Sequence, residues 1–112
     1  MALGLLILAA LLAPASSAQG ASNFTLVNGT GGALSELSIR RSGTEDWKSL
    51  GPAPAAGSRS PIRFANPDCA FDIRATIPGA GPVTWAGVNL CDVKSVTLKR
   101  DESAGAWVDY DQ

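Results

Sequence analysis

The stretch FDIRATI, residues 71–77, decides the fold expected for this chain of 112 residues. Its residues alternate strictly in polarity, with Phe71, Ile73, Ala75 and Ile77 apolar and Asp72, Arg74 and Thr76 polar. Because successive side chains of a strand point to opposite faces, this pattern predicts a half-buried strand of an antiparallel sheet. Ile73 is therefore expected in the core and Arg74 at the surface. A cross-strand ion pair is the expected role of Asp72 and Arg74.

A turn and a returning strand follow this stretch. The segment Pro78–Pro82 contains two prolines and two glycines, which predicts a turn, and residues 83–91 form the expected partner strand. Cys69 and Cys91, the two cysteines of the chain, lie at equal sequence distances from this turn. A hairpin register would bring them together, so a disulfide is predicted, with two buried free thiols as the alternative.

Short runs of strand-forming residues recur along the rest of the chain, at residues 24–28, 36–40, 60–64 and 94–98. Turn residues separate them, in a chain with 12 Gly and 7 Pro, and no amphipathic helix is evident. Residues 19–112 are therefore expected to form a single all-β domain, a small antiparallel β-sandwich of about six to seven short strands. The charged segment 101–112 is expected as a tail, either mobile or packed back through its aromatic residues.

The first eighteen residues predict export. An apolar run at residues 3–12 precedes Pro14 and the small residues Ala15–Ala18, as in a secretory signal peptide cleaved after Ala18. The alternative is a membrane anchor, but a spanning helix needs about 20 apolar residues. The mature protein is therefore expected to be periplasmic or secreted, with no membrane span after cleavage.

The same residues resemble a family of small exported bacterial proteins, common in alphaproteobacteria, to which no biochemical function is assigned. The resemblance rests on F-T-L-V-N-x-T-G at residues 24–31, C-x-F-D-I-R at 69–74, W-x-x-V-N-L-C at 85–91 and V-T-L at 96–98. Asn89 departs from the acidic residue expected before Leu90 in such a protein. The resemblance covers most of the mature chain and ends near Leu98.

Composition excludes several kinds of chemistry. The chain has no histidine, so neither a Ser-His-Asp nor a Cys-His catalytic arrangement is possible. Nine basic residues balance ten acidic ones without a basic patch, which argues against a nucleic-acid partner. The adjacent acids Glu45–Asp46 and Asp101–Glu102 are interpreted as solvated loop charges. No catalytic residue, cofactor or metal ligand is assigned, and loop carboxylates binding Ca²⁺ or acting as acid and base are the alternative.

The three tryptophans are expected to differ in role. Trp47 and Trp85 lie among strand-like residues and are predicted to pack in or at the edge of the core. Trp107 and Tyr110 lie in polar sequence and are candidates for exposed contact residues. The expected function is a non-catalytic binding or structural role in the cell envelope, with an envelope or extracellular partner.

Overall fold

The alternating stretch forms an inner strand of one four-stranded sheet. A computed structural model describes residues 20–111, which form eight strands and no helix. The strands are β1 (Phe24–Asn28), β2 (Ser35–Arg41), β3 (Lys48–Ser49), β4 (Arg59–Ile62), β5 (Ala70–Ile77), β6 (Gly81–Asn89), β7 (Ser95–Asp101) and β8 (Gly105–Asp111). In this part of the chain no helix is long and apolar enough to cross a membrane. The predicted signal segment lies outside the described residues.

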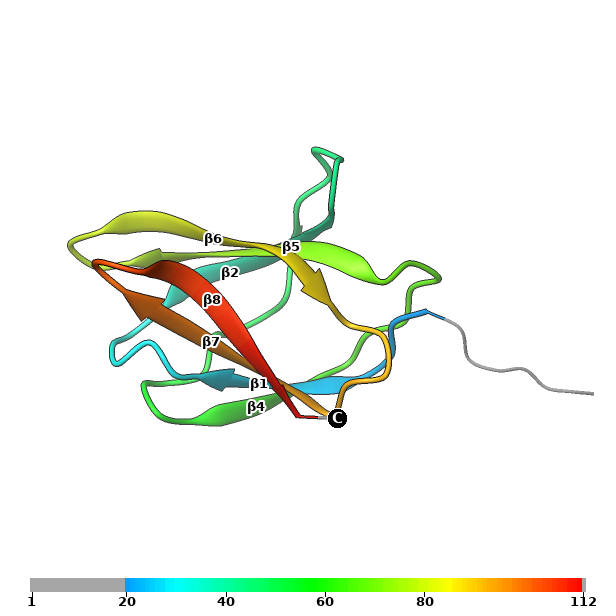
Figure 1. Cartoon of the computed structure of the whole chain (residues 1–112), viewed down its shortest axis with the longest axis horizontal. Helices are drawn as coiled ribbons and strands as arrows, with labels where there is room; N and C mark the ends of the chain where they lie inside the picture. Colours follow the sequence, from blue (N-terminus) through cyan, green and yellow to red (C-terminus); the bar gives the residue numbers. More distant parts are fainter. Residues whose placement is uncertain (1–19, 112) are drawn as a thin grey trace, which may run out of the picture.

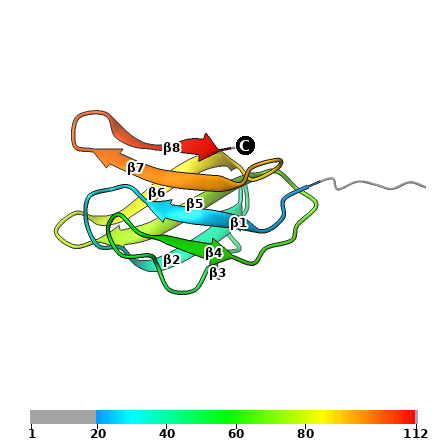
Figure 2. The ribbon, with the colours of Figure 1, turned by 90° about the horizontal axis from the view of Figure 1, so that it is seen from below.

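The strands form two layers, which confirms the predicted β-sandwich (Figure 1). One sheet has the order β4-β1-β7-β8 and the other the order β3-β2-β5-β6. All neighbouring strands are antiparallel except β1 and β7, which pair in parallel. Figure 2 shows the first sheet from its own side, with β4 and β8 at its two edges.

The core lies between the two sheets. Its largest fully buried side chain is Trp85 of β6, as the sequence predicted for that residue. The Trp85 indole N–H donates a hydrogen bond of 2.8 Å to the carbonyl of Lys99 in β7, so the polar atom of the buried ring joins the two sheets. Ile73 is fully buried and Arg74 is half-buried on the opposite face of β5, in agreement with the alternation.

The hairpin of β5 and β6 forms as predicted, but its turn is tighter than the predicted segment, because Gly81 and Pro82 already belong to β6 and pair with Ile77 and Thr76. Ala70 pairs with Asn89, and the Leu90 N–H donates to the Cys69 carbonyl at 2.9 Å. Cys69 and Cys91 form a disulfide, with their Cα atoms 5.1 Å apart. The bridge therefore closes the open end of the hairpin, opposite its turn.

The C-terminal segment differs from the predicted tail. Residues 105–111 form β8, which pairs along its whole length with β7. Ala106 and Val108 pack against the core because they alternate with outward residues. Asn89 N–H donates to the Tyr110 hydroxyl at 2.8 Å, which ties β8 to the end of β6. With β8 and the two-residue strand β3, the sandwich has eight strands instead of six or seven.

Candidate functional site

The loop between β2 and β3 carries Trp47, and the prediction that this residue packs in or at the edge of the core is wrong. Trp47 is half-buried and lies outside the core cluster. The guanidinium carbons of Arg40 and Arg74 lie 4.5 and 3.9 Å from its ring centroid. Both arginines alternate with core residues and project from the outer face of the sheet, so the loop folds over that face and holds the indole there by cation–π contacts. We call Arg40, Trp47, Asp72 and Arg74 the outer-face cluster.

Asp72 is the buried charge of the outer-face cluster. It pairs across strands with Arg40, as expected for a cross-strand ion pair, through an Arg40 Nε–Asp72 Oδ2 distance of 2.8 Å. Its other oxygen accepts hydrogen bonds from the Ser42 hydroxyl at 2.8 Å and the Gly87 N–H at 3.0 Å. The Asp72 side chain is only 8% exposed, although alternation places it on the polar face.

A β-bulge in β6 supplies one of these donors. Phe71 pairs with Val88 and Ile73 with Trp85, so two residues of β6, Ala86 and Gly87, lie opposite Asp72 alone. Gly87 has a φ of 66°, a left-handed conformation that glycine adopts without a Cβ clash. The bulge thereby aims the Gly87 N–H at the Asp72 carboxylate.

These contacts set the acidity of Asp72. Burial alone raises the pKa of a carboxyl group, but the hydrogen bonds from Gly87, Arg40 and Ser42 and the positive charge of Arg40 outweigh it. The pKa of Asp72 is therefore lower than that of an ordinary aspartate. The carboxylate stays charged and fully hydrogen-bonded, which suits a structural anchor for the loop more than a proton-transfer group.

Replacing Asp72 with asparagine should lower stability at neutral pH and flatten its dependence on acid. We expect a loss of about 1–3 kcal/mol at pH 7, since the amide cannot satisfy the Arg40 charge or all three donors. A lowered pKa in the folded state gives stability above the unfolded pKa of about 3.9, which is lost as pH falls through the folded value. Urea melts between about pH 7 and pH 2 should therefore show wild type and variant converging in acid. Parallel curves would contradict this assignment.

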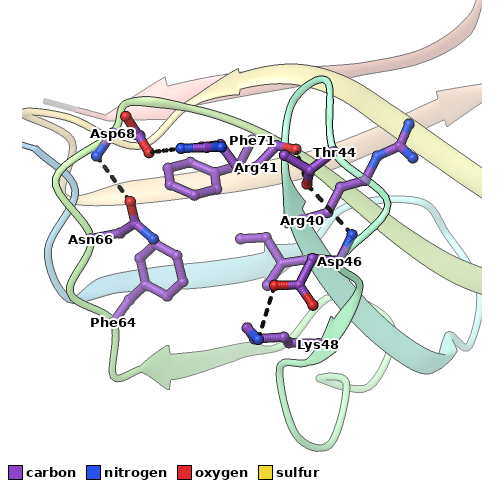
Figure 3. A pocket seen from close by; sticks show the side chains of 10 residues that line it. Arg40, Arg41, Thr44, Asp46, Lys48, Phe64, Asn66, Asp68 and Phe71 are labelled. Carbon is purple, nitrogen blue, oxygen red and sulfur yellow. Dashed lines mark hydrogen bonds and ion pairs between the residues drawn. The ribbon is translucent and has the colours of Figure 1, made fainter.

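The other side of the same loop borders a pocket (Figure 3). This edge pocket has a volume of about 250 Å³ and lies between β2–β3 and the connection from β4 to β5. Its lining residues are Ile39, Arg40, Arg41, Thr44, Asp46, Lys48, Phe64, Asn66, Asp68 and Phe71. Ile39, Phe64 and Phe71 give it an apolar floor, whereas the guanidinium group of Arg40 points away from it.

The charges at the rim of the edge pocket are paired with one another. Arg41 Nη1 lies 3.0 Å from Asp68 Oδ2, and Lys48 Nζ lies 3.1 Å from Asp46 Oδ2. All four side chains are at least 41% exposed, so each pair contributes little to stability. The rim therefore presents compensated charge around an apolar floor.

Aromatic packing fixes the floor of the edge pocket. Phe64 packs edge-to-face on Phe71 with ring centroids 5.2 Å apart and on Phe24 at 6.2 Å. Its backbone N–H donates to the Asn23 side chain at 2.7 Å, although Phe64 lies outside any strand. These contacts preform the pocket without a ligand.

The contact residues predicted from the sequence lie elsewhere. Trp107 and Tyr110 are 40% and 42% exposed, on β8 at the far edge of the other sheet. The structure does not bring them to the edge pocket or to the outer-face cluster. Their role as contact residues stays a prediction.

The predicted loop carboxylates are engaged in local contacts. Glu45 lies 3.4 Å from Arg40, and Asp46 pairs with Lys48. Asp101 accepts the N–H groups of Ala104 and Ser103, and these hydrogen bonds lower its pKa. Within residues 20–111 no three His, Cys, Asp or Glu side chains gather as a metal site.

Comparison with known proteins adds one likeness at the level of fold. No protein-family model matches the chain, and no curated protein matches it. Among solved structures it is similar to one described as the NMR structure of the protein from Eubacterium rectale, with a TM-score of 0.57 and 16% identity. The match covers 88% of this chain and 96% of that chain. At this identity the likeness shows the fold alone, that of a small β-sandwich.

Proposed function

We propose that this protein is an exported, non-catalytic binding protein of the cell envelope, and that its edge pocket receives an apolar group of its ligand. The observation that carries the proposal is the apolar floor of the edge pocket, where half-buried Phe64 lies beside the core residues Ile39 and Phe71 beneath a rim of compensated charges. Concave sites with an apolar lining and a few polar groups are the usual places for ligands.

The size and charge of the edge pocket restrict which chemical groups of a ligand it can accommodate. Its volume of about 250 Å³ lies below that of typical small-molecule sites, roughly 300–1,000 Å³. A single branched or aromatic side chain of a partner polypeptide suits such a volume. Because the rim acids are paired with rim bases, the pocket offers no unpaired charge for a charged ligand group.

Export is supported by the apolar run at residues 3–12 and by the disulfide of the folded domain. Disulfides persist in oxidising compartments such as the periplasm and are rare in the cytosol. A bacterial envelope is the compartment that the resemblance of the sequence implies.

The alternative function is that of a small enzyme or a Ca²⁺-binding module using loop carboxylates. Asp46, Asp68 and Asp72 are each within 3.1 Å of a basic side chain. A carboxylate held by a cation is a weak base and a poor candidate for acid–base catalysis. Stabilisation of the protein against heat by Ca²⁺ alone would favour this alternative.

An NMR titration with N-acetyl-leucinamide tests the edge pocket. We expect the backbone amide signals of Thr44, Lys48, Phe64 and Asn66 to shift, with a dissociation constant on the order of 1 mM for so small a probe. N-acetyl-alaninamide, which lacks the apolar branch, should cause smaller shifts at the same concentration.

Variants make this test specific. Thr44→Trp places a large ring at the mouth of the edge pocket and should abolish the shifts. Ser103→Trp adds the same side chain in the exposed turn between β7 and β8 and should leave them unchanged. Shifts that are absent, that spread over unrelated surfaces, or that survive Thr44→Trp would refute the pocket as the binding site.

A further inference from the structure

We propose that Arg74 is the centre of a second binding site, on the outer face of the β3-β2-β5-β6 sheet, which takes the carboxylate of a uronic-acid glycan. The site is separate from the edge pocket, because its side chains point to the opposite side of the sheet from Ile39 and Phe71. The inference does not depend on the proposed role of that pocket.

Arg74 is a cation held in place without an anion, so the cross-strand ion pair expected for it does not form among residues 20–111. Its guanidinium carbon lies 3.9 Å from the Trp47 ring centroid. Among residues 20–111 no carboxylate lies within 4.0 Å of it, whereas Arg40 and Arg41 both have acidic partners. Several other bases in this part of the chain also have no ion pair: Arg59, Arg63, Lys94, Lys99 and Arg100. None of these stacks on an aromatic ring, so Arg74 alone combines an uncompensated charge with a fixed orientation.

The stack leaves the hydrogen-bond donors of Arg74 available. A guanidinium group has five N–H donors around its edge and none on its flat faces. The Trp47 side chain has no hydrogen-bond acceptor atom, so its contact with Arg74 engages none of these donors in a hydrogen bond. It restricts the rotation of the side chain, and this reduces the entropy lost when an anion binds.

Two hydroxyl groups flank Arg74 in the sheet. Ser38 of β2 and Thr84 of β6 are its direct partners on either side, so the three side chains project from the same face. Strands in a sheet lie about 4.8 Å apart, so Ser38, Arg74 and Thr84 form one row across three strands, with a hydroxyl-bearing residue on each side of the arginine. Neither hydroxyl has a hydrogen-bond partner among the described residues.

The acidic side chains nearest the row of Ser38, Arg74 and Thr84 contact residues other than Arg74. Asp72 compensates Arg40, and Glu45 also lies against Arg40, with a side chain that is 92% exposed. Glu36 accepts a hydrogen bond of 2.9 Å from the hydroxyl of Thr76, which lies two residues along β5 from Arg74. The row itself, Ser38–Arg74–Thr84, contains one positive charge and no acid.

The row fits a sugar acid better than an acidic peptide. A planar carboxylate accepts two parallel hydrogen bonds from a guanidinium edge. The flanking hydroxyls, which both donate and accept, match the hydroxyl groups beside the carboxylate of a uronic acid. The row offers no exposed large apolar side chain for a peptide, because Trp107 and Tyr110 lie on the other sheet.

Calorimetric titration with tetragalacturonic acid at low salt tests this proposal on the folded, oxidised protein. Wild type should bind, Arg74→Gln should bind at least about ten-fold more weakly, and Arg74→Lys should lie between them because lysine lacks the planar fork. Lys99→Gln removes a charge from the outer face of the other sheet and should bind as wild type does. Methyl esterification of the sugar should abolish binding by the wild-type protein.

Three results would overturn the proposal. These are wild-type affinity in Arg74→Gln, equal loss in Lys99→Gln, or binding that esterification does not change. Poly-glutamate serves as a second ligand, and equal affinity for it would overturn the assignment to a glycan. Near-identical amide NMR spectra of Arg74→Gln and wild type beyond the outer-face cluster would exclude misfolding as the cause of a loss.

Discussion

Ile73→Ala should lower the free energy of unfolding by about 2–5 kcal/mol, through lost apolar burial and the cavity left behind. Ile73 is fully buried in the inner strand β5, between β2 and β6. The matched control is Arg74→Ala, one residue along the same strand on the opposite face. It loses a half-exposed cation–π contact with Trp47 and should cost under about 1 kcal/mol. Urea melts of the two oxidised variants compare them directly.

A larger loss for Arg74→Ala than for Ile73→Ala would contradict the packing described here. It would mean that the outer-face cluster contributes more to stability than the core beneath it. Arg74 would then be a structural residue, and its availability to a ligand would be in doubt.

Removing the disulfide should have the second large effect. The double variant Cys69→Ala/Cys91→Ala should lose roughly 3 kcal/mol, because the bridge closes a loop with a sequence separation of 22 residues. For a small domain with about 5–15 kcal/mol of total stability this is a large share. Urea melts of the double variant and of wild type, oxidised and reduced, measure the loss.

Reduced wild type should resemble the double variant, since both lack the same covalent constraint. Thiol titration of the denatured, unreduced protein should find no free sulfhydryl. Two free sulfhydryls, or a double variant as stable as oxidised wild type, would contradict the contribution assigned to the bridge.

The β5–β6 hairpin was the most predictable part of the fold, because its signals are local. Alternation in residues 71–77 fixes which side chains face the core, and the Pro- and Gly-rich segment that follows places the turn, although the register shifts at the bulge opposite Asp72. Cys69 and Cys91 flank this segment and meet at the open end of the hairpin. Each of these features depends on residues close together in the sequence.

The outer-face cluster was not predictable in the same way. Trp47 is an apolar residue in strand-like sequence, and only the path of its loop takes it to Arg40 and Arg74 instead of the core. Alternation predicts that Asp72 is a surface residue, because the pattern contains no information on the loop that covers the outer face. One signal was available: Gly87 inside a strand pattern is typical of a bulge, and the bulge provides a donor to Asp72.

The last strand and the edge pocket are two other features that the sequence did not predict. Ala106, Val108 and Tyr110 alternate as a strand would, but the charged residues of segment 101–112 suggested a tail until pairing with β7 was known. The edge pocket combines residues from β2, β3 and the β4–β5 connection. Their proximity depends on how two sheets pack, which no local pattern encodes.

The proposed function depends on export of the domain with its disulfide closed, and one mass measurement tests this most directly. The full chain would be expressed in a bacterium and recovered from the envelope or medium for intact-mass analysis without reduction. We predict a chain that begins at Gln19 and is two hydrogens lighter than its reduced form, as the Cys69–Cys91 bridge requires. A mass that still includes residues 3–12, or one that reduction does not change, would contradict the account.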